Sequence, residues 1–137
     1  MTLKREIVNY DSLNGKQQEL YNFHRLAGKL ANYGYYSIQL SDDWQGADFL
    51  AVHFNGEDSL KVQLKGRMEF NKKYNGKDLF IAFPHGDDFY LYPHDKMLNV
   101  VLLEQGIEKT ASWQDNGHYS WPKPTKWALA LLEDYKV

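Results

Sequence analysis

The sequence predicts a single domain of mixed α/β (α+β) class over residues 1–137, with one central sheet flanked by helices. The chain has 137 residues, which is the size of one domain and too short for two. Aromatic residues make up 15% of it, which favours a substantial sheet over a plain helical bundle. Helical periodicity occurs near both ends, and strand-type alternation occurs between them. We therefore expect one helix, four or five strands and then two more helices.

The first element we expect is an amphipathic helix over residues 16–33, ended by Gly34. Its apolar stripe is formed by Leu20, Phe23, Ala27, Leu30 and Ala31. Residues 35–40 then favour a strand and residues 41–46 a polar loop. Residues 47–54 are apolar on both faces, which predicts a second strand at a central place in the sheet.

The rest of the chain continues the sheet and then returns to helices. Leu60, Val62 and Leu64 alternate with polar residues, which predicts a half-buried strand after a turn at residues 55–58. Residues 78–83 and 88–92 flank a turn at 84–87 and predict a hairpin. Residues 95–105 favour a helix ended by Gly106, and 109–121 show no clear pattern. Residues 125–135 predict a last helix with Thr125 as its N-cap.

Composition excludes several classes of protein. There is no cysteine, so disulfides, thiolate zinc sites, iron–sulfur clusters and cysteine nucleophiles are ruled out. The longest apolar runs are far shorter than the roughly 18 residues that a membrane span needs. The N-terminus has no apolar stretch of signal-peptide length, so we expect a soluble cytoplasmic protein that does not enter a membrane.

Charge is distributed unevenly, although the net charge is only −2. Residues 61–77 hold six basic side chains and a single acid, Glu69. Residues 42–58 hold five acids and no Lys or Arg. Two solvated faces of opposite sign would explain this pattern, and so would an anionic ligand held beside a carboxylate site. The overall charge offers no general attraction to nucleic acid.

Three polar residues are expected to converge where the strands at 47–54 and 59–65 pair. A four-residue turn over 55–58 makes paired numbers sum to 113, which places Asp48 opposite Lys65. A two-residue loop at Asn55–Gly56 makes them sum to 111 and places Asp48 opposite Gln63. In both registers opposed residues share a face with Cβ atoms about 5 Å apart. Asp48, Gln63 and Lys65 therefore lie together unless a bulge or an odd loop intervenes.

These residue types suit metal-assisted hydrolysis of a phosphodiester. A carboxylate and an amide oxygen can bind a hard cation such as Mg²⁺. The cation polarises the phosphate and acidifies a bound water, while Lys65 can orient or deprotonate that water. Glu19 lies at the edge of the first helix's apolar stripe and would point toward the sheet. The alternative is that Gln63 and Lys65 form only the solvated side of a strand, that Asp48 is a strand-entry or turn residue, and that Glu19 is a favourable first-turn acid.

This order of residues resembles the PD-(D/E)XK nuclease superfamily, also called the restriction-endonuclease-like fold. The resemblance is carried by the helix with Glu19, by Asp48-Phe49-Leu50-Ala51-Val52 and by Val62-Gln63-Leu64-Lys65. It extends over roughly residues 14–95 and implies a mixed sheet flanked by helices. Ala47 replaces the usual proline before the Asp, and Gln63 replaces the usual acid, which removes one negative charge from the metal site.

The resemblance implies a Mg²⁺-dependent nuclease acting on DNA, with Mn²⁺ as a substitute ion. Asp48 would be the central metal ligand, Gln63 and the carbonyl of Leu64 would complete the protein ligands, and Glu19 would hold metal-bound water. Lys65 would position the nucleophile. Phosphate contacts would come from the basic residues that follow, which are Arg67, Lys72, Lys73 and Lys77. A homodimer is a further expectation, since small enzymes of this kind often need two sites to cut a duplex.

Two rival functions remain open. A catalytically degenerate member of the same fold would bind nucleic acid or a protein partner without cleaving it. A carbohydrate- or base-stacking module would instead use the aromatic residues Trp113, Tyr119, Trp121 and Trp127, which more often form a core. His85 and His94, with nearby aspartates, lack the short spacing typical of a metal site.

Overall fold

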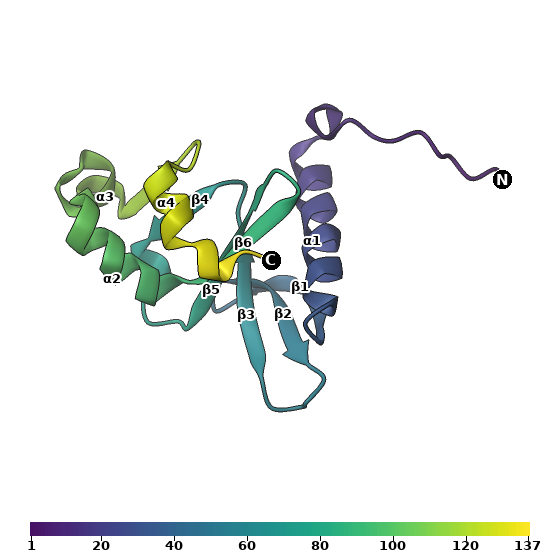
Figure 1. Cartoon of the computed structure of the whole chain (residues 1–137), viewed down its shortest axis with the longest axis horizontal. Helices are drawn as coiled ribbons and strands as arrows, with labels where there is room; N and C mark the ends of the chain where they lie inside the picture. Colours follow the sequence, from purple (N-terminus) through teal and green to yellow (C-terminus); the bar gives the residue numbers. More distant parts are fainter.

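The computed structural model describes all residues from 1 to 137 and has mixed α/β architecture (Figure 1). The helices are α1 (Gly15–Ala31), α2 (His94–Gln105), α3 (Ala111–Asn116) and α4 (Lys126–Leu131). The strands are β1 (Tyr35–Trp44), β2 (Ala47–His53), β3 (Ser59–Leu64), β4 (Met68–Asn71), β5 (Leu79–His85), β6 (Asp88–Pro93) and β7 (His118–Trp121). Short 3₁₀ turns include η2 (Lys72–Tyr74) and η4 (Glu133–Tyr135).

A five-stranded mixed sheet with the order β1-β2-β3-β5-β6 forms the centre of the protein. Its only parallel pair is β3 with β5, and the other neighbours are antiparallel. The sheet is flanked by α1 on one face and by α2 and α4 on the other (Figure 1). The predicted fold class and a central sheet flanked by helices are thus confirmed. The central place belongs to β3, with β2 next to it.

The helix α1 begins with a capping box in which the Asn14 side chain accepts from Gln17 N–H, at 2.8 Å. Its buried face consists of Asn22, Phe23, Leu26 and Leu30. Leu20 and Ala31 were expected on this face but are exposed, Leu20 by 45%, because the face is centred on Leu26, which the predicted stripe omitted. Gly34 ends the turn after the helix with a φ of +85°, as expected of a glycine stop.

The pairing of β2 with β3 follows the register in which residue numbers sum to 111. Phe49 pairs with Val62, and Ala51 pairs with Leu60. The loop nevertheless holds four residues, 54–57, because His53 N–H donates to Asp58 O at 2.8 Å. From the sequence, this register was expected with a two-residue loop. The structure has the register but with a four-residue loop.

Two segments differ from the sequence predictions because of pairing that the sequence does not reveal. Residues 41–44 belong to β1, which shifts register between Gln39 and Trp44, and only Gln45 and Gly46 form the turn, both with positive φ. The last helix ends at Leu131 and not at residue 135. Beyond it the chain turns so that Val137 and Phe89 exchange backbone hydrogen bonds of 2.8 and 3.0 Å.

A second, two-stranded sheet pairs β4 with β7, from Met68–Trp121 to Asn71–His118. Both strands have four residues, which is too short for a periodic pattern, and they lie about fifty residues apart in the sequence. Met68, Phe70 and Trp121 are buried and join this small sheet to the main one. Residues 109–121 gave no clear prediction because they hold a six-residue helix, α3, and the four-residue strand β7, both too short for a periodic pattern.

Two hydrophobic cores lie on opposite faces of the main sheet. The larger has 17 buried residues and joins β5, β6 and α2 to the small sheet. The smaller has nine and joins Phe23, Leu26 and Leu30 of α1 to β2 and β3. None of the helices has the length and hydropathy that crossing a membrane requires.

Candidate functional site

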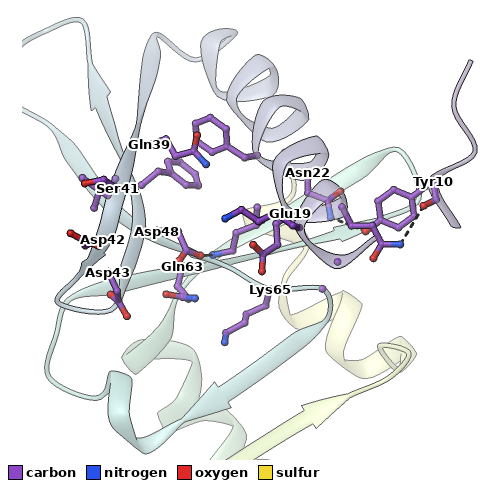
Figure 2. Close-up of a pocket in the computed structure, with 18 residues that line it drawn as sticks. Tyr10, Glu19, Asn22, Gln39, Ser41, Asp42, Asp43, Asp48, Gln63 and Lys65 are labelled. Atoms are coloured by element: carbon purple, nitrogen blue, oxygen red, sulfur yellow. Dashed lines mark hydrogen bonds between the residues drawn. The ribbon is translucent and has the colours of Figure 1, made fainter. Parts of the chain in front are cut away.

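The four residues predicted to form the site line one cavity of about 420 Å³. Glu19 reaches it from α1, Asp48 from the start of β2, and Gln63 and Lys65 from the end of β3. Figure 2 shows Asp48 and Gln63 next to each other, with the Glu19 carboxylate directed toward the sheet. Three segments that are distant in the sequence therefore contribute to a single cavity.

Asp48 continues the contact between β2 and β3 beyond their last backbone pair. One step past Phe49–Val62 places it opposite Gln63, and its Oδ2 accepts from Leu64 N–H at 2.8 Å. The side chain is partly buried. Burial raises the pKa of Asp48, while the Leu64 hydrogen bond and Lys65 oppose this rise, and the nearby charges of Asp43 and Glu19 add to it.

Gln63 carries an amide oxygen that is buried in the protein without a hydrogen-bond partner. A buried polar atom without a partner is costly, commonly by about 1–3 kcal/mol. This oxygen belongs to the side chain opposite Asp48, in the lining of the same cavity. It is therefore a polar atom near Asp48 that lacks a partner within the protein.

Leu64 contributes its backbone. Lys65 N–H donates to Ala82 O of β5 at 2.8 Å, so the backbone groups of Leu64 point the other way, toward β2. The Leu64 N–H is used by Asp48 on that side. The Leu64 carbonyl faces the same side, as the predicted ligand role requires.

Two further acids, Asp42 and Asp43, line the cavity together with Glu19 and Asp48. The sequence analysis noted an acidic run but placed both residues in a loop, whereas they lie in β1. Against these four carboxylates the cavity lining contains two cations, Lys16 and Lys65. This excess of negative charge favours binding of a cation.

Lys65 is turned away from Asp48. Its ammonium lies 3.2 Å from Glu69 Oε2 and 5.5 Å from the centre of the Tyr74 ring, and it makes no ion pair with Asp48. Burial alone would lower the pKa of Lys65, but its interactions with Tyr74 and Glu69 outweigh burial and raise that pKa. Lys65 is therefore a charged ammonium at neutral pH. Of the two roles considered, this state favours orienting a water over deprotonating it.

Glu69 is the residue of this region that sequence reasoning missed. Its side chain is only 14% exposed, and its two carboxylate oxygens contact Lys65 and His118. The one available signal was that Glu69 is the only acid in the basic run at 61–77. The contact to His118 could not be foreseen, because it depends on the pairing of β4 with β7.

The four basic residues expected to contact phosphate are all exposed, but their side chains have different neighbours. Arg67 lines a second cavity of about 360 Å³ with Lys65, Gly66, Glu69 and Pro122. Lys72 lies over the Trp113 ring at 5.2 Å and Lys73 over the Tyr74 ring at 5.1 Å. Lys77 is exposed. Phosphate binding by all four residues stays a prediction.

The other candidate sites are structural. His94 is fully buried, accepts from Asn71 N–H at 3.1 Å and contacts Asp95 at 2.8 Å, so both ring nitrogens are used. Trp113 and Trp121 belong to the larger core. Tyr119 and Trp127 pack against that core, so the four aromatic residues do not form a free stacking platform.

The oxygen donors of the cavity fit a hard divalent cation better than a transition metal. No three His, Asp or Glu side chains lie together closely enough to hold an ion by themselves. A complete ligand set therefore needs Gln63 and the Leu64 carbonyl beside Asp48, with water between the ion and Glu19. The unpartnered amide oxygen of Gln63 fits this set, because Mg²⁺ accepts neutral oxygen ligands and retains several waters.

No protein-family model, curated protein or solved structure matches the chain. The chemistry of the cavity must therefore be argued from its own residues. The arrangement can bind a cation through oxygen atoms, and it places an ammonium at the edge of the same cavity. It contains no nucleophilic cysteine, and His94 and His118, which lie near Glu69, do not line it.

Proposed function

We propose that this chain is a Mg²⁺-dependent nuclease that hydrolyses phosphodiester bonds of DNA, with a restriction-endonuclease-like fold. The observation that carries the proposal is the meeting of Glu19, Asp48, Gln63 and Lys65 in one cavity. The unpartnered Gln63 oxygen beside Asp48 adds independent support, since a bound cation would satisfy it.

Each residue of the cavity has a separate role in this proposal. Asp48, Gln63 and the Leu64 carbonyl would hold the ion, and Glu19 would hold a water on it. Bound Mg²⁺ supplies Lewis acidity toward the phosphate and lowers the pKa of bound water. Lys65 carries a positive charge at the edge of the cavity, where it can orient the attacking water and stabilise charge that develops on the phosphate.

The basic run supports DNA as the polymer that carries the scissile bond. Arg67 lies in the cavity adjoining Lys65, and exposed Lys77 follows on the connection to β5. These side chains would contact backbone phosphates, which gives affinity without sequence preference. Mn²⁺ would replace Mg²⁺ in the same oxygen ligands. Two copies of the chain would present two such cavities to the strands of a duplex.

The decisive experiment is cleavage of supercoiled plasmid and of single- and double-stranded oligonucleotides with Mg²⁺ or Mn²⁺. Asp48→Ala and Lys65→Ala should each reduce cleavage by about 100-fold or more, with little change in DNA affinity for Lys65→Ala. Lys61→Ala is the matched control, because Lys61 lies on the same strand and sheet face but contacts Gln45 outside the cavity, at 3.0 Å. Metal-independent cleavage, or equal loss in the control, would refute the proposal.

A binding-only protein of the same fold is the second candidate. The observation that favours it is the Lys65–Glu69 ion pair, which holds the lysine away from Asp48. Such a protein would bind DNA or a protein partner equally with and without divalent ions. Absence of cleavage on every substrate, combined with retained DNA binding in EDTA, would support it over the nuclease.

A further inference from the structure

Lys65 lies between two carboxylates that compete for it. Asp48 is in the cavity, and the charge of Lys65 acts on it without forming an ion pair. Glu69 lies on the other side, in β4, with its Oε2 at 3.2 Å from the ammonium. Lys65 also lines both cavities, the larger one with Asp48 and the smaller one with Arg67. The position of one flexible lysine therefore determines which carboxylate is neutralised.

The position of Glu69, the ion-pair partner of this lysine, is fixed by contacts to its backbone. Its backbone N–H donates to the Tyr92 hydroxyl at 3.2 Å, and the same hydroxyl donates to Glu69 O at 2.7 Å. Tyr92 is fully buried, and β4 is further fixed by its pairing with β7. His118 contacts the second carboxylate oxygen. The backbone of Glu69 is thus held by Tyr92 and by the pairing with β7, and its carboxylate contacts His118, so we take Lys65 to be the partner of the ion pair that moves.

The ion pair is also energetically different from one on the surface. A carboxylate that is only 14% exposed loses most of its hydration and is stable only when it is paired. Exposed pairs such as Lys136–Glu133, at 3.5 Å, contribute little because both partners remain hydrated. Burial of the Glu69 carboxylate therefore favours keeping Lys65 beside it.

We propose that Glu69 is a positioning residue that keeps Lys65 away from Asp48, and so leaves the Asp48 carboxylate available to a divalent cation. This inference rests on the proposed function, since it assumes that Asp48 holds the ion. Without the Glu69 charge, Asp48 is a carboxylate of the same cavity that already interacts electrostatically with Lys65. Lys65 then neutralises Asp48 and competes with the cation for it.

The test measures Mn²⁺ binding by calorimetry, without DNA and without any reliance on cleavage. Glu69→Gln keeps the shape of the side chain and should weaken Mn²⁺ affinity about tenfold, the effect of a competing unit charge nearby. Adding Lys65→Met to Glu69→Gln should restore the affinity to the wild-type value, because the competitor is gone. Glu133→Gln, which removes the acid of an exposed ion pair, should leave the affinity unchanged.

The outcomes distinguish failure of the positioning role from failure of the proposed nuclease. If the wild type binds Mn²⁺ but cuts no DNA, the proposed nuclease fails while the positioning role is still measured. Equal Mn²⁺ affinity in Glu69→Gln and wild type overturns the positioning role alone. A weakened affinity that Lys65→Met does not restore also overturns it, because failure to restore is what a merely structural role of Glu69 would produce. No Mn²⁺ binding by the wild type overturns both. Circular dichroism of each variant verifies the fold. Lys65→Met alone, which leaves β4 intact, should not weaken Mn²⁺ binding.

Discussion

Replacing Asp48 with asparagine changes one charge and almost no volume, and we expect it to stabilise the fold while it abolishes cleavage. The asparagine oxygen still accepts from Leu64 N–H. What disappears is a partly buried charge whose pKa is raised by burial and, secondarily, by Asp43 and Glu19. A carboxylate with a raised pKa opposes folding at neutral pH, since the unfolded state ionises it more easily.

The magnitude follows from two opposing effects. Turning a charge-assisted hydrogen bond into a neutral one costs about 1 kcal/mol. Relieving a half-buried ion of its lost hydration, net of the attraction to Lys65, gains about 2 kcal/mol. The free energy of unfolding should therefore rise by about 1 kcal/mol, which corresponds to about 4 °C in Tm for a chain of this length.

Thermal unfolding in EDTA and in Mg²⁺ gives the measurement. In EDTA Asp48→Asn should melt above wild type, whereas Asp115→Asn, an exposed acid in α3, should not change Tm. In saturating Mg²⁺ only the wild type should gain stability, by about 2.7 kcal/mol at one hundred times the Kd, so the order reverses. A lower Tm of Asp48→Asn in EDTA, or an equal gain from Mg²⁺ in both proteins, would refute the reasoning.

Three further predictions test other parts of the structure. His94 has a pKa lowered chiefly by burial, so the free energy of unfolding should fall as the pH drops below 6.5, the ordinary pKa of histidine. Urea titrations at several pH values should show a smaller fall in this free energy for His94→Gln. Gly46→Ala should destabilise by about 2 kcal/mol, because a Cβ would lie 2.6 Å from Leu79 at a φ of +87°, and chemical denaturation measures this. Lys77→Ala should weaken DNA binding on all sequences and reduce the slope of log affinity against log salt by about 1, as measured by fluorescence anisotropy; an unchanged slope would remove Lys77 from the phosphate contacts.

Local patterns predicted the elements that are determined locally. The helix α1 has its own cap and apolar stripe, and the hairpin of β5 and β6 has its own turn. The pairing of β2 with β3 could be narrowed to two registers, because strand alternation restricts which residues share a face. That restriction was enough to bring Asp48 and Gln63 together from the sequence alone.

The features that sequence reasoning missed depend on contacts between distant segments. The pairing of β4 with β7 joins two four-residue strands, and neither has a periodic pattern of its own. Glu69 acquires its role from that pairing and from the Tyr92 hydroxyl. The direction of Lys65 could not be foreseen for the same reason, since its partner was not on the strand from which the site was predicted.

The residues of the candidate site lie in parts of the fold that differ in local stability. Glu19 is on α1, whose buried face packs on the sheet through the nine-residue core, whereas Glu69 lies between Met68 and Phe70 of the core of seventeen. Detaching α1 exposes less apolar surface than unfolding the whole chain, so it is the less costly opening. Such an opening would remove Glu19 and leave Asp48 and Glu69 in place. Truncating Leu26 or Leu30 would therefore reduce the fraction of folded molecules that carry a complete site, and faster amide hydrogen exchange confined to α1 would report that fraction.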